Sequence, residues 1–122
     1  MANIDRAYVS IALAWLIAGM ILGLYMGAST DNEYLDVHVA MLLGGFVVLV
    51  VYGVLYRLWP ALKEGAVAKI QFWVAAAGSL GLVIGAALIV NQMGIAVAAV
   101  SSVLAIIGAI LMAVQFWTRA GI

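Results

Sequence analysis

Long apolar stretches separated by short polar breaks make up most of this chain. Four of these stretches are long enough to cross a bilayer core of roughly 30 Å, which takes about 20 residues of helix. Lipid offers no hydrogen-bond partners to the backbone, so each stretch is predicted to be a helix. The predicted helices cover residues 7–28, 37–59, 70–90 and 95–117.

The breaks between the apolar stretches carry signals for helix ends. The first break, residues 29–36, is polar and acidic, and Asp36 is predicted to cap the second helix. Pro60 disfavours helical backbone in the residue before it, which predicts that the second helix ends there. Residues 61–69 are predicted to form a short charged loop, and residues 91–94 a tight turn.

The composition strengthens the membrane interpretation. Hydrophobic residues make up 69% of the chain and charged residues 8%, whereas soluble domains carry about 25% charged residues. We therefore expect an all-α integral membrane four-helix bundle, with residues 1–122 as a single domain in the lipid bilayer. The first apolar stretch is longer than a signal-peptide core, so it should be retained as a helix. The formal net charge of zero gives no reason to expect a nucleic-acid partner.

The basic residues predict how the chain is oriented. All of them fall on one side of a four-span arrangement, and cytoplasmic segments are enriched in Lys and Arg. Both termini and the middle loop are therefore predicted to face the cytoplasm, in a multi-pass protein of the bacterial inner membrane. The residues concerned are Arg6, Arg57, Lys63, Lys69 and Arg119.

Most catalytic and transport chemistries have no support in the sequence. No Asp or Glu lies inside a predicted span, which argues against a proton-coupled transporter. The chain has no cysteine, and it lacks metalloprotease and phosphate-loop motifs, so it is not expected to be an enzyme on its own. A small oligomeric transporter or channel, lined by the hydroxyls of Ser79, Ser101 and Ser102, is the weakest of our functional hypotheses.

Glycines recur at helical spacing in the first and third predicted helices. Small residues at this spacing let helix backbones approach closely within lipid. Two interpretations remain open, namely packing inside one bundle and pairing between protomers. We also expect the chain to form a homo-oligomer or to join a larger membrane complex. The glycines are Gly19, Gly23 and Gly27 in the first helix, and Gly81 and Gly85 in the third.

His38 is the only histidine and the only candidate metal ligand of its type. It lies two residues after Asp36, which places it about 3 Å deeper along the second helix, near the outer membrane boundary. One interpretation is an interfacial histidine hydrogen-bonded to Asp36, Glu33 or Tyr34. The other is an axial ligand of haem iron.

A haem site would need a second ligand and room for the ring. The second ligand would be His38 of another protomer, or Met26 or Met93 at similar depth. Gly45, two turns further along the second helix, leaves a recess. Either a porphyrin edge or a neighbouring helix would fill that recess.

The second predicted helix carries the series Leu35, Asp36, Val37, His38, Ala40, Gly44 and Gly45, followed by Tyr56 and Arg57. This series resembles subunit I of the cbb-type haem–copper cytochrome c oxidases. The second predicted helix looks like the helix of that family that carries an axial histidine of its low-spin haem b. The chain looks closer still to small bacterial four-span proteins labelled as oxidase subunit-I-like, over about three-quarters of its length. The matching positions in the second helix are Leu35, Asp36, Val37, His38, Ala40, Gly44, Gly45, Tyr52, Gly53, Tyr56, Arg57 and Pro60. Elsewhere they are Trp15, Gly19, Gly23, Tyr25 and Gly27 in the first helix and Phe72 and Trp73 in the third.

The resemblance implies a function, and its departures limit that function. It implies b-type haem held by His38 at the outer side of the membrane, for electron transfer or haem handling in a respiratory chain. The small relatives carry further histidines where this chain has Ala40 and Gln71. Oxygen reduction by this chain alone is therefore not expected. The alternative is a non-catalytic structural or assembly subunit without a cofactor.

Overall fold

A computed structural model describes residues 2–120, and every regular element in that range is helical. This range contains four helical spans long and apolar enough to cross a membrane, which confirms the predicted all-helical architecture. Three spans are single helices, and the second consists of three consecutive segments. The spans are α1 (Ile4–Ser29); α2 (Leu35–Val39), η1 (Ala40–Val47) and α3 (Val48–Leu58); α4 (Ala66–Val90); and α5 (Ala96–Arg119), with the short 3-10 helix η2 (Pro60–Lys63) after α3.

The helix ends agree with some of the predicted signals and depart from others. The predicted loop over residues 61–69 is wrong in part, because η2 ends only at Lys63 and α4 already begins at Ala66. α3 ends at Leu58, and Trp59 leaves the helix with φ −122° and ψ 79° before Pro60, as predicted. The turn after α4 has positive φ at Gly94, where glycine is tolerated. The prediction that Asp36 caps the second helix is wrong, because α2 begins one residue earlier and Tyr34 is its cap residue. Asp36 lies in the first turn, where its charge favours the helix dipole.

The middle of the second span departs from the predicted regular helix. Residues Ala40–Val47 form the π-helix η1, a wider winding that is rare in proteins and frequent at functional sites. Ser79 of α4 donates a hydrogen bond of 2.7 Å from its hydroxyl to the carbonyl oxygen of Gly44. The hydroxyl thus satisfies a backbone group in the irregular segment and ties it to α4.

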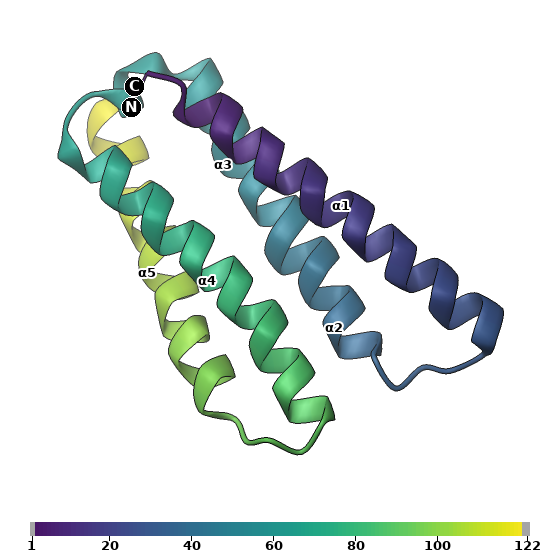
Figure 1. Cartoon of the computed structure of the whole chain (residues 1–122). Helices are drawn as coiled ribbons and strands as arrows, with labels where there is room; N and C mark the ends of the chain where they lie inside the picture. Colours follow the sequence, from purple (N-terminus) through teal and green to yellow (C-terminus); the bar gives the residue numbers. More distant parts are fainter. Residues whose placement is uncertain (1, 121–122) are drawn as a thin grey trace.

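The spans form two helical hairpins that lie side by side (Figure 1). α1 packs against the second span, and α4 packs against α5; the hairpins meet mainly where η1 contacts α4. Both chain ends lie at the end of the bundle that carries η2, which we call the terminal end. The opposite end carries the loops of residues 30–34 and 91–95, and we call it the loop end.

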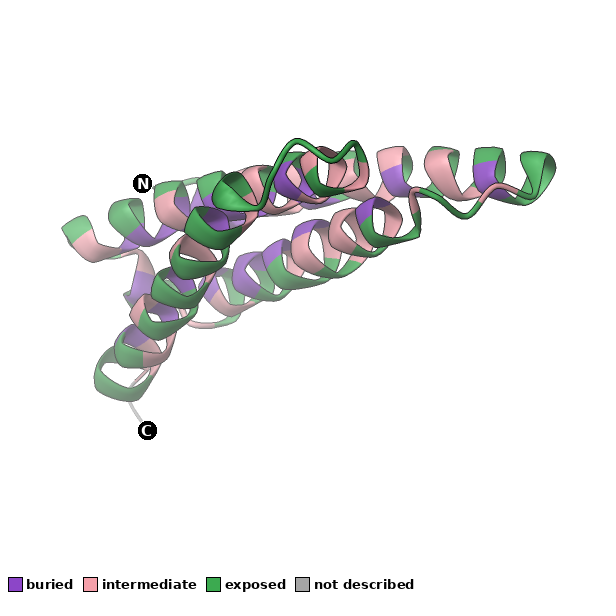
Figure 2. Cartoon of the chain, turned by 90° about the horizontal axis from the view of Figure 1, so that it is seen from below, coloured by how far each residue is buried: buried purple, intermediate pink, exposed green. Residues whose placement is uncertain are grey.

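The exposed surface is rich in large apolar side chains. Figure 2 shows exposed residues along the outer sides of the helices, with buried residues turned toward neighbouring helices. Leu24 and Trp117, for example, are 74% and 78% exposed. A water-soluble protein rarely exposes large contiguous apolar surface. The surface therefore supports association with a lipid bilayer as a multi-pass protein.

The predicted glycine ridges are used inside this chain. A Cβ atom at Gly19 would meet the side chain of Leu42, and one at Gly81 would meet Ser101. A Cβ at Gly85 would lie 2.6 Å from the backbone of Ala98. Gly27 has nothing within 4 Å of its Cβ position. The geometry at the first three positions is that of packing inside one bundle.

Candidate functional site

His38 lies in the contact between α2 and α1. Its Nδ1 donates a hydrogen bond of 2.8 Å to the carbonyl oxygen of Gly19, since a carbonyl can only accept. The ring also fills the space that Gly23 leaves free, because a Cβ atom there would lie 2.8 Å from Cε1 of His38. His38 is half-buried. The observed partner is therefore a backbone group of α1, and not Asp36, Glu33 or Tyr34.

The hydrogen bond to Gly19 determines which ring nitrogen is free. With its proton on Nδ1, the neutral imidazole keeps a lone pair on Nε2. Nε2 makes no hydrogen bond to the described part of the chain. Histidines that bind metals are commonly oriented in this way, with the other ring nitrogen donating to a backbone carbonyl. Nε2 of His38 thus has the electronic arrangement of a metal ligand.

The two places considered for a haem are both packed against α1. The Cε1 edge of the His38 ring faces Gly23 closely. The recess predicted at Gly45 is filled by Trp15, whose Cγ would lie 2.5 Å from a Cβ there. Trp15 therefore occupies the space predicted for a porphyrin edge or a neighbouring helix.

The two methionines proposed as second ligands occupy different surroundings. Met26 is 6% exposed and lies three residues after Gly23 on α1, whereas Met93 is 70% exposed in the turn between α4 and α5. Neither makes a hydrogen bond with His38. Within residues 2–120, no three or more His, Cys, Asp or Glu side chains gather where they could hold a metal ion.

The serines considered for a passive pore are engaged in helix contacts. Ser79 donates to the backbone of η1, and Ser101 is buried where Gly81 of α4 approaches α5. Ser102 donates to the carbonyl oxygen of Ala98 within its own helix. Two of these hydroxyls therefore lie in contacts between helices, whereas the exposed Ser102 is bonded within α5.

A buried polar cluster near the terminal end was missed in the sequence analysis. It consists of Tyr8, Tyr56, Gln71 and Gln115, contributed by all four spans. The hydroxyls of Tyr8 and Tyr56 both donate to Oε1 of Gln71, the second over 3.1 Å. Nε2 of Gln71 donates to the carbonyl oxygen of Gly108 over 3.1 Å, and Nε2 of Gln115 donates to the Tyr56 hydroxyl over 3.0 Å.

This polar cluster joins all four spans through neutral groups. Burying a polar group in an apolar environment costs free energy unless it is hydrogen-bonded, and hydrogen bonds between helices add stability in membranes. Oε1 of Gln115 is the exception, because it is buried without a partner in the described part of the chain. The sequence signal for this cluster is the presence of two glutamines, Gln71 and Gln115, inside otherwise apolar spans.

Comparisons with protein-family models, with curated proteins and with solved structures found no match to this chain.

Proposed function

We propose that the chain is a non-catalytic structural or assembly subunit of a membrane complex. The observation that carries this proposal is the placement of His38. Of the side chains in the spans, the imidazole of His38 is the best suited to bind a metal or to transfer a proton. Its Nδ1 and its ring are engaged in the α1–α2 contact. The polar cluster, Ser79 and Ser101 likewise lie in contacts between helices. The polar groups inside the bundle thus serve packing.

The proposed orientation places the terminal end in the cytoplasm of a bacterial cell. All the basic residues of the chain lie in the segments that come together there. The positive-inside tendency then favours a cytoplasmic location for both termini and for η2. His38 would accordingly lie near the outer side of the inner membrane.

The proposed partner surface is the outward face of α5. This helix packs almost entirely against α4, whereas α1 contacts both the second span and α4. Val103, Ile106 and Ile110 on α5 are exposed apolar residues. Helices associate within lipid through close packing, so this face is suited to another membrane helix, either in a second copy or in a larger subunit.

Site-directed cross-linking tests the proposal, because the chain contains no cysteine. Val103→Cys on α5 is expected to give a cross-linked species in native membranes, identified by mass. Ile17→Cys on α1 is a matched control in an exposed apolar position away from α5. Equal cross-linking at both positions, or none at Val103→Cys, would contradict the proposed surface.

Haem binding through His38 is the second candidate function. The free lone pair on Nε2 favours it, whereas the close packing of the His38 ring against Gly23 of α1 disfavours it. Bound haem would supply the redox chemistry of its iron. The test is a visible spectrum of protein expressed with added haem, in oxidised and reduced states. A Soret band that disappears in His38→Ala supports this candidate, and a flat spectrum of the well-folded protein rejects it.

A further inference from the structure

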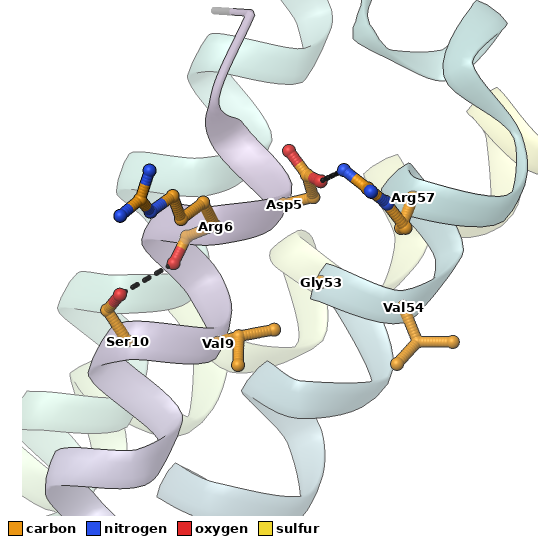
Figure 3. A pocket seen from close by; sticks show the side chains of 7 residues that line it. All are labelled: Asp5, Arg6, Val9, Ser10, Gly53, Val54 and Arg57. Carbon is orange, nitrogen blue, oxygen red and sulfur yellow. Dashed lines mark hydrogen bonds and ion pairs between the residues drawn. The ribbon is translucent and has the colours of Figure 1, made fainter.

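A groove at the terminal end runs between α1 and α3 and has a volume of about 350 Å³ (Figure 3). Its floor is apolar, formed by Val9, Gly53 and Val54. Its rim carries Arg6 and Arg57. The groove therefore has an apolar floor within the span and two cationic side chains at the membrane boundary.

The rim has an excess of positive charge. Asp5, the acidic residue of the groove, is paired with Lys63 over 3.1 Å and with Arg57 over 3.3 Å. The side chain of Arg57 is 79% exposed and uses one nitrogen for that pair, so its other donors remain available. Arg6 is exposed, and Figure 3 shows it on the other side of Asp5 from Arg57.

The shape of the floor limits what can enter. α1 and α3 approach closely at Gly53, where a Cβ atom would lie 2.9 Å from Cγ2 of Val9. The floor of the groove is therefore shallow at Gly53, which suits an extended hydrocarbon chain better than another helix, whose diameter is about 10 Å. Val9 lies about one turn below Arg6, so a chain on this floor would have its polar end at the rim.

We propose that this groove binds an anionic phospholipid. The phosphate lies between the guanidinium groups of Arg6 and Arg57, and one acyl chain lies along Val9 and Val54. Guanidinium groups match phosphate geometry with several donors. Basic pockets between membrane helices on the cytoplasmic side are suited to acidic lipid head groups. The carboxylate of Asp5 is ion-paired with Lys63 and Arg57. It therefore holds Arg57 at the rim and leaves the positive charge of Arg6 unpaired by it.

Native mass spectrometry of the full chain in mild detergent tests this proposal. The probes are phosphatidylglycerol and phosphatidylcholine with the same acyl chains. The anionic lipid should bind about tenfold more tightly, because both lipids carry a phosphate but only phosphatidylcholine carries a choline cation, which the two arginines repel. Equal binding of the two lipids would overturn the proposal.

Variants separate the two parts of the site. Arg6→Gln should lower the preference for the anionic lipid, and the double variant with Arg57→Gln should abolish it. Lys69→Gln is the matched control, since it removes one exposed cation at the same end of the bundle but outside the groove. An equal loss in the control would overturn the proposal. Arg6 makes no side-chain ion pair in the described range, so its variant should fold normally.

The acyl part of the site has its own test. Val54→Trp fills the groove and keeps both arginines, so binding of the anionic lipid should fall. Glycerol phosphate, which has the charge without the acyl chains, should not compete. If glycerol phosphate displaces the lipid, or if Val54→Trp binds as well as the original chain, the groove is not a lipid site.

Discussion

The two ends of the bundle are held together by different kinds of contact. Toward the terminal end, large side chains from all four spans meet in one cluster, with Tyr8, Tyr56 and Gln71 linked by hydrogen bonds. Toward the loop end, small residues make room for the neighbouring helix within each hairpin, since Gly23 faces the His38 ring and Gly85 faces the backbone of Ala98. The stability of the terminal end should therefore depend on particular large and polar side chains. The stability of the loop end should depend on glycines that leave space for the neighbouring helix.

The largest expected effect is at the loop end. Gly85→Ala places a Cβ 2.6 Å from the backbone of Ala98, which cannot rotate away as a side chain can. Overpacking of this kind should lower the free energy of unfolding by about 3 kcal/mol. The measurement is unfolding in mild detergent with increasing dodecyl sulfate. Gly27→Ala is the control, because nothing lies within 4 Å of its Cβ position; equal effects would show that the α4–α5 contact is not tight.

A smaller effect is expected for the polar cluster. Gln71→Leu removes the acceptor of two tyrosine hydroxyls and a donor to Gly108. The free energy of unfolding should fall by about 2 kcal/mol, given the modest value of each hydrogen bond in membranes and the cost of unpaired buried groups.

The matched control for Gln71 is Gln115→Leu. Gln115 loses one hydrogen bond to Tyr56, and the substitution also removes its unpartnered buried oxygen. These changes oppose each other, so Gln115→Leu should be much milder than Gln71→Leu. If the two variants are equally destabilised, the stability of the terminal end does not depend on Oε1 of Gln71 as the acceptor shared by the two tyrosine hydroxyls.

The smallest effect concerns the contact between His38 and Gly23. Gly23→Ala alone should be destabilising, because the new methyl group would press against Cε1 of His38. His38→Ala removes that obstacle, so the double variant should be more stable than the sum of the single effects predicts, by about 1 kcal/mol. A thermodynamic cycle from the same unfolding measurement checks this. Strict additivity would mean that His38 does not pack in the Gly23 space in solution.

The sequence analysis was most successful where the solvent determines the structure. Lipid requires long, internally hydrogen-bonded helices, so the spans could be read from the length of the apolar stretches. Pro60 acts through its own ring on the neighbouring residue, so the end of α3 was also predictable. The π-helix around Gly44 was not, because it is coupled to a hydroxyl of α4 that is distant in sequence.

The candidate site shows the same division. The sequence singled out His38 and placed it near the start of the second span, because a lone histidine in an apolar chain is visible from composition. It left open whether a ring or a helix fills the recess at Gly45, and Trp15 of α1 fills it. Gln71 was noted only as a departure from the resembling family, yet it lies at the centre of the polar cluster.

The sequence by itself determined that this protein consists of four apolar helical spans with basic residues toward one side. Those properties depend on how each segment interacts with lipid and water, and they do not require contacts with the other segments. Only the tertiary structure decided which faces meet, where the hydrogen bond of His38 goes, and that Tyr8, Tyr56, Gln71 and Gln115 come together. In lipid, every outward apolar face is equally well solvated. Pairing therefore depends on local shape and hydrogen bonds between distant segments, which hydrophobic patterning does not encode.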